Sequence, residues 1–511
     1  MNIISFLGIF ALLGFAWLLS YDKKIIPFKV IFWGIGLQLV FAMIILSKSN
    51  LSFFGMAILG ALITAYQFSD FSSRKIKPMQ IITPLLIFFG IYYCYTNGYT
   101  GHILFETFSE KVAYFLSLSD YGAKFLFGNL ADSAYFFGDG TLTGHILDTN
   151  GEIVPGVKVS VDNNWTGFGF QFAFKVLPTI IFFGGFISVL YYLGIMQKLI
   201  NSLSKFMRWT IGTSGAETLS CSANIFVGQT EAPLLIKPFI NKMTMSELGT
   251  IMVGGFATIA GGVLAGYIAL GLPAGHLIAA SVMSAPAALV IGKIIFPEKE
   301  ETQTGGTAEL PQIETGSNVV EAASNGILDG LKLAVNVGAM LVGFIALIAV
   351  LDLLLNVIDG FIDGYIFSGI YKDYGDSILS SAAGEYSGYF PGSLQTFFGT
   401  VLRPLAFLMG VPWEESHKVG HLLGIKLSLN EFVAYGQLGE YLNGGLSERA
   451  TIISTYALCG FANFSSIGIQ LGGISALAPK RKADLAKIGL RAMYGGAIAS
   501  WLTATIAGIL I

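Results

Sequence analysis

Charged residues are scarce in this chain. Only 12% of its 511 residues are Asp, Glu, Lys or Arg, against ~25% in soluble domains. The net charge is -3 and the basic residues form short clusters rather than an extended stripe, so we expect no binding to nucleic acid. Hydrophobic residues make up 54% of the sequence. This composition excludes an ordinary soluble domain and indicates a membrane protein.

Cysteine and catalytic motifs are also rare. Cys94, Cys221 and Cys459 lie in or beside apolar runs without metal-type spacing, so no disulfide framework is predicted. The phosphate-binding sequence G-x-x-x-x-G-K-[ST] does not occur, so ATP-driven pumping has no visible motif. The first apolar run lacks a basic leader and an A-x-A cleavage site, which favours a membrane anchor over a signal peptide. We expect neither an enzyme nor a bound cofactor.

Long apolar runs dominate the sequence. A helix needs about 20 apolar residues to cross the hydrocarbon, and about ten runs approach that length. They lie at residues 3–20, 27–47, 51–69, 80–97, 168–195, 247–271, 275–296, 333–357, 449–475 and 486–511. Lys and Arg cluster after the first, third, fifth and ninth runs, which predicts cytoplasmic loops there, external segments at 98–167 and 358–395, and external termini.

The less apolar segments suggest how the chain is divided. We expect an N-terminal scaffold at 1–130, an external insert at 131–167, a first repeat at 168–296, a flexible cytoplasmic linker at 297–318 and a second repeat at 319–511. The insert contains alternating residues around Asn150-Gly151 that predict a small strand hairpin at 145–161. Residues 103–117 and 196–208 have the amphipathic spacing of helices at the membrane surface.

An internal repeat joins two glutamates. The motif S-E-x-x-T-I followed by G-F-A occurs at 246–257 and again at 447–462, with Glu231 and Glu431 upstream of the two copies. Each acid lies in an apolar segment interrupted by Gly, Pro and polar residues, at 213–240 and at 396–445. Such segments are typical of re-entrant hairpins. The spans that follow them carry G-G-F-A-T-I-A-G-G and C-G-F-A-N-F-S-S-I-G, whose dense small and polar residues predict that the helix opens there. The predicted topology inserts them from opposite sides, so the fold is an all-α polytopic membrane protein with an inverted repeat.

A carboxylate inside a membrane is costly. Insertion scales give about 2.5–3.5 kcal/mol for such a group, so Glu231 and Glu431 are expected to face a cavity and bind a ligand. The alternatives are a structural pair between Glu231 and Lys237, or a position in a solvent-exposed loop.

Several long motifs resemble those of the concentrative nucleoside transporters. They are A-N-I-F-V-G-Q-T-E-A-P, G-G-F-A-T-I-A-G-G-V-L-A-G-Y, N-E-F-V-A-Y and C-G-F-A-N-F-S-S-I, and they occur in the same order. The resemblance covers roughly residues 168–511, and residues 1–50 and 100–130 more loosely. It implies a homotrimer in the cytoplasmic membrane that takes up nucleosides by sodium symport, through an elevator-like movement of the hairpin domain.

The resemblance also assigns site residues. The nucleoside site would comprise Gln229, Thr230 and Glu231 at the base, Glu431, Asn463 and Ser466 at the ribose, and an apolar wall of Val263, Leu333 and Phe461. A sodium site would comprise Asn224, Thr258 and the backbone carbonyls of Val227 and Ile259. Proton coupling is the alternative, because some relatives use protons and a glutamate in a dry cavity can titrate.

Two rival functions use other features. His417 and His421 stand one helical turn apart beside Glu414 and Glu415, as a metal-dependent intramembrane hydrolase would require, although a polar turn is the simpler interpretation. A passive channel would show only downhill flux. The sequence does not distinguish a purine from a pyrimidine substrate.

Overall fold

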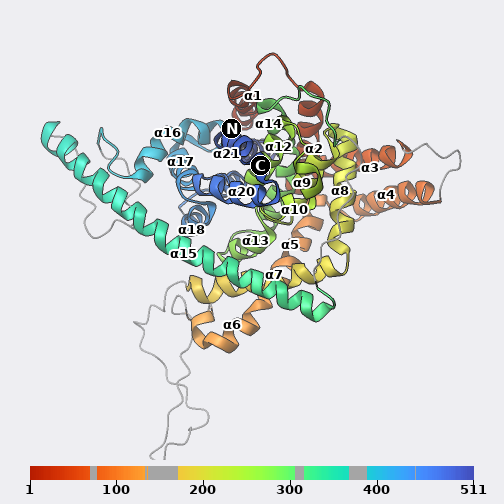
Figure 1. The fold of residues 1–511 in the computed structure, drawn as a ribbon, viewed down its shortest axis with the longest axis horizontal. Coiled ribbons are helices and arrows are strands. Elements are labelled where there is room, and N and C mark those ends of the chain that lie inside the picture. Colours follow the sequence, from red (N-terminus) through yellow and green to blue (C-terminus); the bar gives the residue numbers. More distant parts are fainter. Residues whose placement is uncertain (70–77, 133–134, 136–170, 305–315, 368–387, 443–444) are drawn as a thin grey trace, which may run out of the picture.

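The computed structural model describes residues 1–69, 78–132, 135, 171–304, 316–367, 388–442 and 445–511. Within these ranges every regular element is a helix, which confirms the predicted fold class (Figure 1). The predicted strand hairpin at 145–161 lies outside the described residues.

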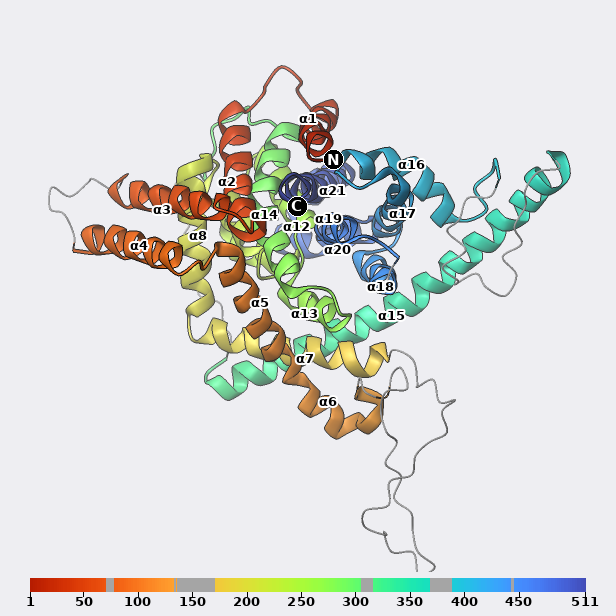
Figure 2. The same cartoon turned by 180° about the vertical axis from the view of Figure 1, so that it is seen from behind.

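The N-terminal part consists of helices that match the predicted apolar runs. They are α1 (Asn2–Leu18), α2 (Phe28–Leu46), α3 (Leu51–Ser69), α4 (Pro78–Thr96), α5 (Gly101–Ser117), α6 (Ser119–Phe127) and the short η1 (Gly128–Ala131). Helices α3 and α4 lie side by side and project away from the rest of the protein, as Figures 1 and 2 show. The amphipathic segment predicted at 103–117 is the helix α5.

Two long helices cross the periphery together. They are α7 (Phe172–Tyr192) and α15 (Val319–Asp359), which is followed by the π-helical η3 (Gly360–Ile366) (Figure 1). A side chain added at Gly184 of α7 would lie 2.7 Å from the carbonyl oxygen of Gly326 on α15, so the two backbones approach closely. Helix α15 begins well before the run predicted at 333–357, because Asn318 caps its first turn by accepting from the Glu321 N–H at 2.9 Å.

The first repeat contains a short re-entrant pair followed by a broken helix. Its elements are α8 (Ile195–Ile211), which is the second predicted amphipathic helix, α9 (Gly215–Ala223), α10 (Ala232–Leu235), α11 (Lys237–Ile240), α12 (Met245–Ala257), α13 (Gly261–Ala269) and α14 (Ala274–Ile295). Between α12 and α13 the helix is interrupted at 258–260, inside the stretch whose small residues predicted that the helix opens.

The second repeat has the same order of elements. They are α16 (Leu394–Leu408), α17 (Trp413–Ser428), α18 (Glu431–Tyr441), α19 (Glu448–Leu458), α20 (Phe464–Leu477), η6 (Pro479–Arg481) and α21 (Lys482–Leu510). The second break falls at 459–463. Gly460 has a φ of 136° there, a conformation that L side chains rarely adopt.

The segment 396–445 holds three helices rather than the two arms predicted for a hairpin. Gly410, with a φ of 101°, ends α16 and turns the chain into α17. The tight turn of the hairpin then lies at Leu429 and Asn430, between α17 and α18. The prediction missed the first turn because apolar residues continue across it.

The core lies where α12, α14 and α21 pack together, with α1, α2 and α19 around them (Figure 2). Nearly all side chains of α14 and of the second half of α21 are buried, although both helices are long and apolar enough to cross a membrane. In the described part, six helices are long and apolar enough to cross a membrane, or up to seven if one bent pair forms a single span. The count of about ten crossings stays a prediction.

A buried group of charges holds the beginning of the first hairpin. The Lys293 ammonium contacts Glu217 at 2.8 Å and Glu298 at 3.2 Å. Glu217 also accepts from the backbone N–H of Ser214, which caps α9. Thr304 is buried and donates its hydroxyl hydrogen to Glu247. Glu298 and Thr304, in the first part of the predicted flexible linker, thus contact this buried group, because the buried charges need partners.

Candidate functional site

A large cavity lies between the two hairpins, α7 and α15. Its volume is 1230 Å³. All nine residues of the predicted nucleoside site line it: Gln229, Thr230, Glu231, Val263, Leu333, Glu431, Phe461, Asn463 and Ser466. These residues come from segments that are up to 237 positions apart in the chain, as the Gln229–Ser466 contact shows.

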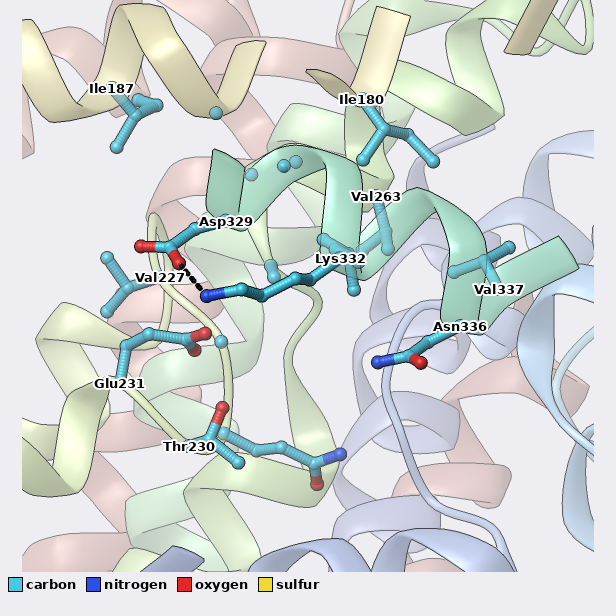
Figure 3. Close-up of a pocket in the computed structure, with 18 of the residues that line it drawn as sticks. Ile180, Ile187, Val227, Thr230, Glu231, Val263, Asp329, Lys332, Asn336 and Val337 are labelled. Carbon is cyan, nitrogen blue, oxygen red and sulfur yellow. Dashed lines mark hydrogen bonds and ion pairs between the residues drawn. The ribbon is translucent and has the colours of Figure 1, made fainter. Parts of the chain in front are cut away.

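The turn after α9 supplies the polar residues on one side of the cavity. The Gln229 amide donates to the Ser466 hydroxyl at 3.3 Å and accepts from Gln470 Nε2 at 3.1 Å. Gln229 is therefore fixed by α20, the second half of the other broken helix. Thr230 and Glu231 follow it and point into the cavity, where Glu231 is exposed (Figure 3). No pair between Glu231 and Lys237 occurs among the ion pairs of the described residues.

Glu431 occupies the opposite side and is nearly buried, with 4% of its surface exposed. One carboxylate oxygen accepts from the Tyr267 hydroxyl at 2.9 Å, and the other accepts from Asn463 Nδ2 at 3.3 Å. Glu431 is the first residue of α18, where the positive end of the helix dipole favours a carboxylate. Asn463 caps α20 by accepting from the Ser466 N–H at 2.8 Å. Two helix N-termini therefore meet at this carboxylate.

Apolar side chains form the remaining wall. Val263 lies on α13, Leu333 on α15 and Phe461 in the second helix break, and all three line the cavity. Phe183 of α7 and Phe432 of α18 line it as well. The cavity thus has two polar sides separated by apolar and aromatic groups, which suits a ligand with a flat ring and a polar substituent.

The four residues predicted to bind sodium lie where α9 and α12 end. Asn224 is the C-cap of α9 and Thr258 is the C-cap of α12, and both are 1% exposed. Asn224 Oδ1 is buried without a hydrogen-bond donor. The Gly261 N–H donates to the Phe226 carbonyl at 3.1 Å, so Val227 and Ile259 belong to two adjoining loops. Oxygen atoms at two negative helix ends have the chemistry that a small cation requires.

Residues of α15 that the sequence analysis did not select also reach the cavity. Lys332 extends toward the loop that carries Glu231 and pairs with Asp329 at 3.2 Å, and Asn336 lies one turn further along (Figure 3). The charged pair is largely exposed to the cavity. The sequence did contain one indication of this position, because Asn336 is a polar residue inside the apolar run A-V-N-V-G. The internal repeat, however, did not include Asn336.

The segment with His417 and His421 is helical, so the expected polar turn is wrong. Both residues lie on α17. His421 is buried and its Nδ1 lies 3.5 Å from the Tyr441 hydroxyl. Among the described residues, no group of three His, Cys, Asp or Glu side chains has the arrangement of a metal site.

Comparisons with known proteins point to the same family in several parts of the chain. The family described as "Na+ dependent nucleoside transporter" matches at residues 7–53 with its N-terminal part and at 276–508 with its C-terminal part, and "Nucleoside recognition" matches 173–273. "Uncharacterized transporter YutK" of Bacillus subtilis is 40% identical over 88% of this chain and 96% of its own length. "Sodium/nucleoside cotransporter 1" of Mus musculus is 41% identical over 80% of this chain, and the matched region covers 56% of the length of that protein.

A solved structure covers the whole chain. It is that of CNTnw in an inward-facing substrate-bound state, with 32% identity, a TM-score of 0.74, and coverage of 100% of this chain and 98% of CNTnw. These relatives are transporters and not enzymes, which rules out the hydrolase alternative. This multi-pass membrane protein therefore belongs to the concentrative nucleoside transporter family.

Proposed function

We propose that this protein takes up nucleosides by symport with sodium, using elevator-type alternating access. The observation that carries the proposal is the cavity itself. Polar residues from both hairpins and from the second helix break line it, and the unpartnered Asn224 Oδ1 is buried two positions before Phe226, which also lines it. The family match and the likeness to an inward-facing, substrate-bound transporter support the same function.

The two polar sides suit the two parts of a nucleoside. Nucleobase edges carry both donors and acceptors, which the amide of Gln229, the hydroxyl of Thr230 and the carboxylate of Glu231 complement. Ribose hydroxyls are donors, and Glu431 accepts such bonds in a charge-assisted form. Val263, Leu333 and Phe461 would contact the faces of the base and the sugar. Uridine is the first substrate to test.

Sodium is favoured over a proton because the candidate ion ligands do not titrate. An amide, a hydroxyl and backbone carbonyls offer only neutral oxygen atoms at the ends of α9 and α12. One positive charge crossing about 100 mV releases about 2.3 kcal/mol. At ~1.4 kcal/mol per decade, this supports a gradient of roughly 40-fold. One ion is therefore sufficient for accumulation.

The proposed location is the cytoplasmic membrane, with both termini external and three subunits assembled. Many large apolar side chains of α15 are exposed, among them Val342, Leu347 and Leu354. Such a surface needs lipid or a neighbouring subunit to cover it. Cross-linking in membranes would test the trimer, and accessibility of cysteines introduced at the two termini would test their orientation.

Uptake of labelled uridine and adenosine into proteoliposomes tests the function. We expect an inward sodium gradient to drive accumulation above the external concentration, and choline to abolish it. Accumulation driven by a pH gradient without sodium would support proton coupling instead. Flux that only equilibrates the two sides under a sodium gradient would identify a channel and refute symport.

A further inference from the structure

The second repeat contains a buried cationic side chain. Lys426 lies on α17 and its side chain is fully buried. Within the described residues, no carboxylate forms an ion pair with it. Its ammonium donates to the carbonyl oxygen of Ala457 at 2.9 Å. A buried ammonium without a paired carboxylate is costly, so its position needs a reason.

The ammonium lies where two helices end. Ala457 is in the last turn of α19, whose final carbonyls have no intrahelical partner, and Lys426 is itself in the last turn of α17. Neutral donors satisfy two neighbouring carbonyls: Tyr435 Oη donates to Thr455 at 2.8 Å and Ser500 Oγ donates to Cys459 at 2.6 Å. The Lys426 ammonium therefore places a positive charge at the negative ends of two helix dipoles.

The first repeat has the corresponding pair of helix ends. There α9 packs against α12, as α17 packs against α19 in the second repeat. At the ends of α9 and α12 stand Asn224 and Thr258, and Asn224 Oδ1 has no donor. One repeat thus presents an unpartnered acceptor at this position, and the other presents a lysine ammonium.

We propose that Lys426 is a tethered counterpart of the sodium ion, occupying in the second repeat the place that sodium takes in the first. The inference rests on the proposed sodium site. It explains why two similar repeats would need only one transported ion for each nucleoside. The fixed charge also attracts the buried carboxylate of Glu431, five positions further along the chain, whose burial would otherwise be more costly.

Replacement of Lys426 tests this role through the ion stoichiometry. Below saturation, the uridine Kd should fall tenfold for each tenfold rise in sodium when one ion is coupled, and a hundredfold when two are. We expect the wild-type protein and Lys426→Arg to show the tenfold dependence. Lys426→Asn supplies an oxygen ligand and space, so its dependence should approach a hundredfold. A folded Lys426→Asn protein with tenfold dependence and wild-type uridine affinity would overturn the proposal.

The reverse substitution keeps the test decisive if Lys426→Asn does not fold. Cys221 stands three residues before the C-cap of α9, as Lys426 stands three residues before the C-cap of α17. Cys221→Lys should carry an ammonium into the sodium position and make uridine binding independent of sodium, whereas the uncharged Cys221→Met should remain sodium-dependent. A folded Cys221→Lys protein that keeps the tenfold dependence would contradict the inference. Sodium-independent binding by the wild-type protein would instead refute the proposed function.

Discussion

Replacing Glu431 with Gln tests whether this carboxylate binds the sugar. The carboxylate has about four lone-pair sites, and the Tyr267 hydroxyl and Asn463 Nδ2 use one on each oxygen. Roughly two sites remain for ribose hydroxyls. In Glu431→Gln, one carboxylate oxygen becomes an NH₂ group. This group faces either the Tyr267 hydroxyl or Asn463 Nδ2, and it cannot accept a hydrogen bond from them or from a ribose hydroxyl. The fold should persist because the side chain keeps its shape.

The expected loss of affinity follows from these contacts. Hydrogen bonds to a charged group contribute about 1.5–3 kcal/mol each. Loss of one such bond should weaken uridine binding about 10- to 150-fold at saturating sodium. Calorimetry on the purified protein would measure the change, together with 2′,3′-dideoxyuridine, which lacks the two hydroxyls. The wild-type protein should discriminate strongly against the analogue, and the variant should discriminate much less.

Glu231→Gln provides the matched control. Glu231 lies on the opposite side of the cavity, in the first hairpin, so its replacement should weaken base binding but preserve discrimination between uridine and the dideoxy analogue. If Glu431→Gln bound uridine within twofold of wild type, or if it discriminated as strongly as wild type, the assignment of Glu431 to the ribose would be wrong.

Three further predictions concern the ion and the fold. Asn224→Ala removes the unpartnered buried oxygen, so the sodium concentration for half-maximal uptake should rise at least about tenfold. The control Ser222→Ala should change this concentration little. Equal concentrations for the two variants would exclude Asn224 as a sodium ligand. Lys293→Met leaves Glu217 buried without its cation and should lower the free energy of unfolding by about 3–5 kcal/mol. The pair of Lys299 with Asp22 lies at the surface and is screened by solvent, so Lys299→Met should change stability little and is the control in thermal unfolding. Equal shifts for the two variants would contradict the reasoning. Gly460→Ala places a side chain 2.7 Å from the Phe256 carbonyl at a positive φ and should cost about 1–3 kcal/mol, whereas Gly472→Ala meets open space and should be neutral in the same assay.

The sequence predicted features that depend on local chemistry. Apolar runs interrupted by Gly and polar residues indicated the breaks at 258–260 and 459–463, because a helix opens where small residues leave its backbone weakly supported. The predicted nucleoside residues also gather around one cavity, although their roles stay predictions.

Features that depend on distant partners were not predictable. The contact between Gln229 and Gln470 joins positions 241 apart, and no local pattern specifies it. The burial of Thr304 was missed because acidic linkers usually remain solvated, whereas here its hydroxyl donates to the buried carboxylate of Glu247. The early start of α15 depends on one cap, and the approach of Lys332 to the cavity depends on how that helix crosses α7.

The two helix breaks are joined directly, which suggests how the ion and the nucleoside influence each other. The Phe461 N–H donates to the Thr258 carbonyl at 3.3 Å, so the break that would bind sodium contacts the break whose Phe461 and Asn463 line the cavity. A cation that fixes Thr258 would therefore also fix the nucleoside site, and coupling between two ligands must be reciprocal. The factor by which sodium tightens uridine binding should be preserved in Glu431→Gln, which weakens uridine with and without the ion, but should fall toward one in Asn224→Ala. If Glu431→Gln abolished the factor, the coupling would run through the carboxylate rather than through the contact between the breaks.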